Sequence, residues 1–141
     1  MSTVAVVYWS GTGNTEMMAQ AVAAGAQEAG AAVTLCTAAE FDAGLLGQFA
    51  AVAFGCPAMG AEELEETEFA PLFAACEGAL AGKKLGLFGS YGWGDGEWMR
   101  TWEDTCRGDG AQLAAEPVIC QEAPDEDALT ACRALGAALA G

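Results

Sequence analysis

Hydroxyl, amide and glycine groups gather in one short loop, SGTGNT, at residues 10–15. The two glycines leave backbone N–H groups free to converge, and the polar side chains add hydrogen-bond donors. Such a donor set, followed by a helix, suits a phosphate group. The nearest Lys or Arg in the sequence is Lys83, so an anion here would be met by neutral donors. The loop consists of Ser10, Gly11, Thr12, Gly13, Asn14 and Thr15.

Two better-known phosphate loops do not match this segment. A Walker A loop needs a lysine after its last glycine, and a dinucleotide-binding turn needs a third Gly or Ala where Glu16 stands. What remains is a strand–loop–helix unit whose helix begins near Thr15 and directs its first N–H groups at a terminal phosphate. The alternative is a ligand-free glycine turn in which a threonine only caps the helix.

Two further loops carry side chains that a flat ring could contact. They are PAMGAEELEE at residues 57–66 and SYGWGDG at residues 90–96. Trp93 lies between two glycines, which favours stacking on a ligand over a place in the core; the alternative is a tryptophan that faces a partner protein. Met59 could cover the other face of the ring or only fill a gap. The remaining tryptophans, Trp9, Trp98 and Trp102, are predicted to be packing residues.

Composition limits the classes of function. The net charge of -15 disfavours nucleic acid and anionic membranes as partners and favours a basic protein. The absence of histidine excludes histidine-based triads and histidine zinc ligands. The six cysteines form no C-x-x-C pair, so we expect them to be reduced and buried. Without a signal sequence or a membrane-spanning run, we expect a cytoplasmic protein with one domain over residues 1–141.

Apolar runs alternate with helical patterns along the chain. Strands are expected at residues 3–9, 32–36, 50–56, 84–89 and 113–121, and helices at 15–29, 40–47, 69–80, 97–107 and 125–140. Helix stops are expected at Gly30, Gly82, Gly108 and Gly141. The pattern predicts a doubly wound α/β domain with a five-stranded parallel sheet and helices on both faces. Because ligands of such sheets bind beyond the carboxyl ends of the strands, the three loops are expected to meet there.

The segments VYWSGTGNT, CPAMG with EELEE, and LFGSYGWGDGEWMR resemble the flavin-contacting loops of short-chain flavodoxins. The similarity runs essentially end to end, including PDE before the last expected helix. It implies a non-covalently bound FMN. Flavodoxins are themselves a standard example of the strand order 2-1-3-4-5 with FMN at the switch between strands 1 and 3, so this order is implied by the resemblance.

The resemblance also implies a role for each loop residue. Residues 10–15 would hold the FMN phosphate as a dianion. Met59 matches the residue on the inner face of the flavin ring, and Trp93 the residue on the outer face. Gly60 matches the residue whose carbonyl turns toward flavin N5, and Glu62 the carboxylate that accepts a hydrogen bond from flavin N3–H. The expected contacts are completed by Pro57, Ala58, Ser90, Tyr91, Gly92, Gly94 and Asp95.

The family's function is implied as well. It is a low-potential one-electron carrier that cycles mainly between semiquinone and hydroquinone, without catalytic residues or a metal. Carboxylates near the ring, with no nearby cation, would make the anionic hydroquinone harder to form. Two departures from the family, Ala61 and Ala123, bear on the redox tuning. Ala123 lies in the stretch QEAP, where a carboxylate can lie near the ring.

Partners are expected to be reductases and oxidoreductases with basic docking surfaces, and the chain is expected to be a monomer. Five carboxylates follow the second loop: Glu62, Glu63, Glu65, Glu66 and Glu68. They either favour a helix N-terminus or steer a basic partner, and both roles can coexist.

The alternative function is an FMN-dependent oxidoreductase of the quinone-reductase kind on the same fold. A phosphorylated receiver domain shares the strand order, but it needs an acidic cluster after strand 1 and an aspartate after strand 3. The sequence has VYWSG and FGCPAMG at these places.

Overall fold

The computed structural model describes residues 2–60 and 63–141. In this part of the chain the strands are β1 Thr3–Tyr8, β2 Ala32–Thr37, β3 Ala51–Gly55, β4 Lys84–Tyr91, β5 Gln112–Leu113 and β6 Val118–Gln121. The α-helices are α1 Asn14–Glu28, α2 Phe69–Cys76, α3 Glu97–Gly108 and α4 Glu126–Ala140. Short 3₁₀ turns cover Ala38–Glu40, Ala43–Gln48 and Glu77–Ala79.

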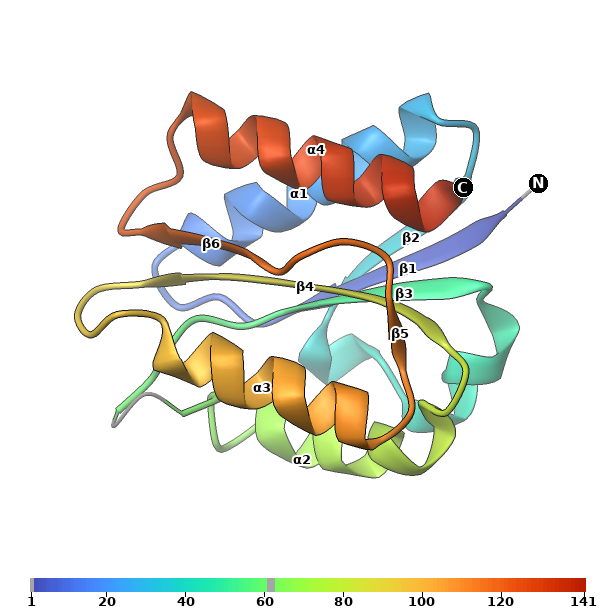
Figure 1. Cartoon of the computed structure of the whole chain (residues 1–141), viewed down its shortest axis with the longest axis horizontal. Helices are drawn as coiled ribbons and strands as arrows, with labels where there is room; N and C mark the ends of the chain where they lie inside the picture. Colours follow the sequence, from blue (N-terminus) through green and yellow to red (C-terminus); the bar gives the residue numbers. More distant parts are fainter. Residues whose placement is uncertain (1, 61–62) are drawn as a thin grey trace.

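The strands form a parallel sheet in the order β2-β1-β3-β4-β5, and β6 also pairs with β4. Helices α1 and α4 cover one face, and α2 and α3 cover the other (Figure 1). The central strands β1 and β3 are therefore buried on both sides, which explains their continuous apolar sequence. The predicted doubly wound fold is confirmed.

The glycines at the contact between α1 and α4 are a packing requirement. A Cβ atom on Gly25 would lie 2.0 Å from the Arg133 carbonyl oxygen, and one on Gly136 would lie 2.0 Å from that of Val22. The two helix backbones touch there, so no larger residue fits. This contact fixes α1, whose N-terminus begins at the loop of residues 10–15.

The expected fifth strand is wrong in one respect. Residues 113–121 do not form one strand: β5 pairs with the start of β4 and β6 with its end, so both occupy the fifth position in the sheet. Pro117, immediately before β6, has no backbone N–H to donate to a ladder. The break leaves β6 as a short edge segment of its own.

The remaining differences concern where helices end. Gly108 is the last residue of α3 rather than a stop beyond it, and Gly110, with φ of 86°, takes the left-handed position instead. The helix expected at residues 69–80 ends at Cys76 and continues only as a 3₁₀ turn. The short helix expected at 40–47 is replaced by the two 3₁₀ turns that flank residue 41.

Trp98 and Trp102 are 2% and 3% exposed, as predicted for core residues. All six cysteines are free; Cys36 and Cys120 are half-buried and the other four are buried. Within residues 2–60 and 63–141, no helix combines the length and apolar character needed to cross a bilayer. No cluster of metal-ligating side chains was found in the same residues.

Candidate functional site

A cleft of about 230 Å³ opens at the carboxyl ends of the strands, where the three predicted loops meet. These loops lie together at one end of the sheet, on the left in Figure 1. The cleft is lined by Trp9, Gly11, Thr12, Asn14, Thr15, Pro57, Ala58, Met59, Ser90, Tyr91, Gly92 and Glu122. Ten of these residues were predicted from the sequence to contact a ligand.

Backbone hydrogen bonds hold the loops to one another beyond the strands. The Trp9 N–H donates to the Gly55 carbonyl oxygen at 3.0 Å, and the Ala58 N–H donates to that of Ser90 at 3.0 Å. The side chains of Thr15 and Ser90, both buried, are also hydrogen-bonded, with 3.3 Å between their oxygens. The cleft is therefore positioned by the sheet itself.

The N-cap residue of α1 has no side chain that could cap the helix. The N-cap residue is Gly13, with φ of 95°, and a Cβ atom built on it meets nothing within 4 Å. Ser10 Oγ accepts from the N–H groups of Gly13 and Glu16 at 3.0 and 3.3 Å, which closes the loop on itself. The helix begins at Asn14, one residue before the predicted start, and the alternative of a threonine N-cap is wrong.

The second loop closes at Met59 and Glu63, whose backbone N–H and C=O groups exchange two hydrogen bonds of 2.8 Å. Met59 is 37% exposed and lines the cleft. Gly60 has φ of 52° and lines a neighbouring recess instead. Ala61 and Glu62 lie outside the described residues, so the roles expected of them stay predictions.

Glu65 takes the first of the two roles expected for the acidic run, that of favouring a helix N-terminus. Its side chain is 5% exposed and accepts hydrogen bonds from three successive backbone N–H groups at the start of α2, with distances of 2.8–2.9 Å. Burial opposes the charge, but these donors and the Thr67 hydroxyl outweigh it and lower the pKa of Glu65 to about 2. Glu65 therefore caps α2 and does not face a partner. Glu63, Glu66 and Glu68 are exposed, and Glu68 also accepts a hydrogen bond from the indole of Trp9 at 3.1 Å.

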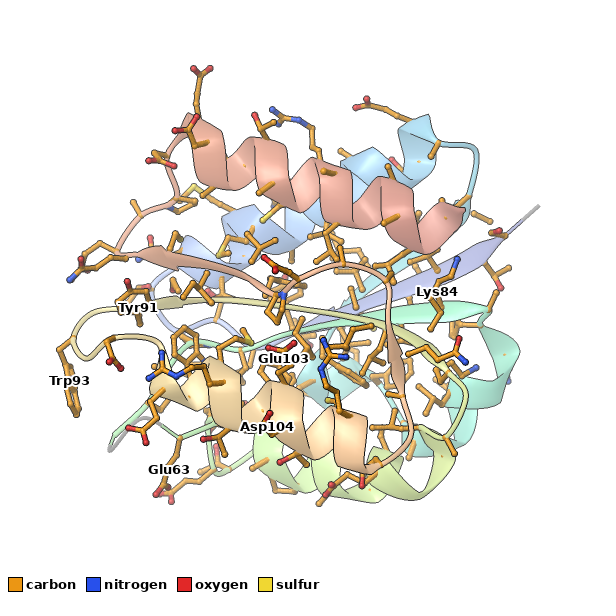
Figure 2. The ribbon with its side chains drawn as sticks, in the orientation of Figure 1. Glu63, Lys84, Tyr91, Trp93, Glu103 and Asp104 are labelled. Atoms are coloured by element: carbon orange, nitrogen blue, oxygen red, sulfur yellow. The ribbon has the colours of Figure 1, made fainter. Side chains whose placement is uncertain are left out.

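The third loop carries Trp93, which is 63% exposed. Figure 2 shows it at the tip of the loop between β4 and α3, projecting away from the sheet. Asp95 forms an exposed ion pair with Arg100 at 3.0 Å, which ties the loop to the first turn of α3. Trp93, Gly94 and Asp95 thus lie at the rim and do not line the cleft. The open position of Trp93 agrees with the sequence; its stacking on a ring stays a prediction.

Two lining residues were missed. Trp9 packs against the core as predicted, but it also forms a wall of the cleft. Glu122 follows β6 with φ of 59°, and its N–H donates to the Tyr91 carbonyl oxygen at 2.8 Å. From the sequence, Ala123 was expected to be the residue nearest the ring in this stretch, and alanine has no carboxylate. The rule that ligands bind beyond carboxyl strand ends, applied to the last strand, would have found Glu122.

The chemistry of the cleft suits a phosphorylated ring compound. Among the residues that the structure describes, no Lys or Arg lines the cleft, so its donors are neutral, and Glu122 adds a negative charge. The thiol of Cys56, next to the cleft, is buried, and burial raises its pKa to about 12, which makes it unreactive. The donors, the open glycine and the apolar side chains fit FMN.

Fold and cleft together define a doubly wound nucleotide-binding protein with its site at the switch in strand order. The flavodoxin family model matches residues 6–136. The chain is 46% identical to the flavodoxin of Clostridium beijerinckii, with 86% of this chain and 88% of that one covered. It is 42% identical to the flavodoxin of Megasphaera elsdenii, covering 97% and 98% of the two chains. The solution structure of two-electron reduced Megasphaera elsdenii flavodoxin superposes with a TM-score of 0.89 at 43% identity, over 97% of this chain and 98% of that one.

The chain therefore belongs to the flavodoxin family. Flavodoxins bind FMN and are electron-transfer proteins rather than enzymes. It follows that this protein is an electron-transfer flavoprotein that exchanges electrons with redox enzymes, and the alternative of an oxidoreductase is not favoured.

Proposed function

We propose that this protein, as one domain over residues 1–141, is a low-potential carrier of single electrons between redox enzymes. The observation that carries the proposal is a cofactor cleft without a lining Lys or Arg and with the carboxylate of Glu122. FMN supplies the redox chemistry, and the carrier would use mainly its semiquinone and hydroquinone states.

The first loop is proposed to hold the phosphate. The N-terminus of α1, whose N-cap is a glycine, offers backbone N–H groups and the positive end of a helix dipole, and Thr12 and Asn14 add side-chain donors. Ser10 acts within the loop because its oxygen accepts two loop N–H groups. Gly13 keeps the space above those N–H groups free of side chains, and Gly11 leaves room for the ring of Trp9.

The second and third loops are proposed to hold the ring. Met59 would contact the inner face and Trp93 the outer face, with Pro57 and Ala58 beside Met59. The carbonyl oxygen of Gly60 would accept a hydrogen bond from protonated flavin N5, and the carboxylate of Glu62 would accept one from flavin N3–H. The positions of Ser90, Tyr91 and Gly92 in the cleft fit contacts at the pyrimidine end, with Gly94 and Asp95 shaping the loop behind Trp93.

The negative charge around the cleft lowers the potential of the second electron. A negative charge that develops in the cleft is opposed by Glu122 and by the surrounding carboxylates, and no lining cation compensates it. The second electron is therefore harder to add than the first. A fully reduced carrier built in this way is a strong reductant.

Partners are proposed to be reductases and oxidoreductases with basic docking surfaces. Glu63 and Glu66 remain exposed beside the cleft, and Figure 2 shows Glu63 pointing outward from the second loop. With a net charge of -15, two copies of this chain repel each other, which supports a monomer. A cytoplasmic location is proposed from the free cysteines.

An anaerobic redox titration of the FMN-loaded protein, followed by absorbance, tests the proposal. We expect a neutral blue semiquinone to accumulate near half reduction and the second potential to lie below that of free FMN titrated in parallel. Passage from oxidised flavin to hydroquinone with no radical would contradict it, as would a second potential equal to that of free FMN.

A further inference from the structure

The outer edge of β6 carries unpaired backbone groups. The Glu122 N–H donates to the Tyr91 carbonyl oxygen, so alternate residues on its strand face β4. Ile119 and Gln121 then turn their N–H and C=O groups outward, away from the sheet. The side chain of Ile119 is 38% exposed at this edge. Such an edge is a template for one more strand.

Grooves flank this edge on both faces of the sheet. The larger one, about 850 Å³, lies between β6 and α4. Its walls include Val118, Ala128, Ala131 and Leu135, and its carboxylates are Glu116, Asp125 and Asp127. No Lys or Arg lines it within the part of the chain that the structure describes. Figure 1 shows β6 running between α4 on one side and α3 on the other.

The smaller groove, about 190 Å³, lies between β6 and α3. Its apolar lining comes from Met99, Pro117 and Ile119. It also contains Arg100 together with the carboxylates of Glu103 and Glu116, so the charges on this side are mixed. The two faces of the edge therefore differ: the α4 side carries carboxylates and no described Lys or Arg, whereas on the α3 side an arginine lies among the carboxylates.

We propose that the β6 edge binds an extended segment of a partner protein as an added parallel or antiparallel strand, with Lys or Arg alternating with small apolar residues. Strand side chains alternate between the two faces of a sheet. The cationic ones would lie along the alanines of α4 with their charges near Glu116 and Asp127, and the apolar ones would contact Ile119. Backbone hydrogen bonds at Ile119 and Gln121 would supply the remaining affinity.

Other occupants fit less well. A second copy of this chain would place the same carboxylates opposite one another, and each copy carries a charge of -15. The opposite edge of the sheet, β2, is a weaker candidate because its residues line neither groove. The proposal does not depend on the redox function. The β6 edge nevertheless lies next to the cofactor cleft, because Gln121 Nε2 donates to the carbonyl oxygen of Gly92 at 3.4 Å.

Peptide binding to the FMN-loaded protein tests the proposal. One probe is a peptide of alternating lysine and valine; the other is the same peptide with N-methyl groups on the amides of one edge, which keeps the charge but blocks strand pairing. We expect the first to protect the amides of Ile119 and Gln121 from hydrogen exchange, and the second to bind about tenfold more weakly. Equal binding of both peptides, no binding at low salt, or protection at β2 instead would overturn it.

A matched pair of variants on α4 separates this edge from the general negative charge. Ala131→Lys places a cation in the larger groove, whereas Ala137→Lys makes the same change on an exposed part of the same helix outside it. We expect Ala131→Lys to weaken binding of the unmethylated peptide about tenfold and Ala137→Lys to change it less than about twofold. Equal effects of the two variants would show that only net charge attracts the peptide and would overturn the proposal.

Discussion

Helices α1 and α2 both start beyond the carboxyl end of a sheet strand, yet their first N–H groups are used in opposite ways. At α2, the chain supplies its own anion, because the Glu65 carboxylate accepts from three successive backbone N–H groups. At α1, the N-cap is Gly13, and the side chain that accepts from the first turn is the neutral hydroxyl of Ser10, which accepts from the Glu16 N–H at 3.3 Å. Both ends have the same positive dipole.

A helix N-terminus can therefore serve either stability or binding. An internal carboxylate stabilises α2 and makes its N-terminus unavailable to ligands. The N-terminus of α1, which opens on the cleft, is left to an external anion, for which the phosphate of FMN is our proposal. Substitutions at both helix N-termini and in the cleft test this difference.

The largest effect is expected where the internal anion is removed. Glu65→Gln should lower the free energy of unfolding by about 3 kcal/mol at pH 7, because three backbone donors lose a charged acceptor. Urea unfolding measures it. The neighbouring Glu66→Gln, which alters an exposed side chain, should change stability by less than about 0.5 kcal/mol. Equal effects of the two variants would mean that Glu65 is not the cap of α2.

The same carboxylate predicts a pH dependence. Its pKa is lowered from 4.5 to about 2 in the folded protein, so its stabilisation is complete above the higher value. It is lost as pH falls from about 5 to about 2, since the folded carboxylate is then protonated. The stabilities of the wild-type protein and of Glu65→Gln should therefore converge in this acidic range. A constant gap between their unfolding curves down to pH 2 would contradict the assignment.

The next expected effect follows from placing a carboxylate at the N-terminus of α1. Asn14→Asp keeps the shape of the side chain and adds a charge in the cleft, so we expect FMN affinity to fall about 30-fold, or about 2 kcal/mol. Fluorescence titration of the FMN-free protein measures it. Gln20→Glu makes the same charge change at an exposed site on α1 and should leave the affinity within about twofold. Unchanged affinity in Asn14→Asp would place the phosphate elsewhere.

The third prediction concerns the carboxylate that lines the cleft. Glu122→Gln should raise the potential of the second electron by roughly 20–40 mV, because removing a partly screened negative charge eases the formation of an anion. Glu126→Gln, on an exposed residue outside the cleft, is the matched control and should shift it by less than about 10 mV. A lowered potential in Glu122→Gln would reverse the proposed role of charge.

The smallest effect is expected for the exposed carboxylates beside α2. Glu63→Lys and Glu66→Lys should slow electron transfer to a basic cytochrome about two- to fivefold at low salt and hardly at all at high salt. Glu28→Lys makes the same charge reversal at the far end of α1 and is the control. Stopped-flow rates that are independent of salt, or equally reduced in the control, would count against docking here. Charge reversal at Glu65 is unsuitable because it removes a cap.

Much of the fold could be predicted because strong local patterns specify it. The apolar runs of β1 and β3 and the helical periods of α1 and α4 determine elements that are buried on defined faces, and the elements lie where they were expected. The break between β5 and β6 was missed because a strand's hydrogen-bond partner lies far away in sequence. Apolar residues alone do not reveal whether the ladder is continuous.

The three site loops were predictable from local sequence, because their glycines, hydroxyls and exposed tryptophan are unusual outside a binding site. The roles of the individual carboxylates, in contrast, depend on how the chain folds. Glu65 and Glu66 are neighbours of the same type, but one is buried against three N–H groups and the other is exposed. The physical reason is that a carboxylate's role depends on the donors and the solvent around it in three dimensions, and these come from residues that no local pattern brings together.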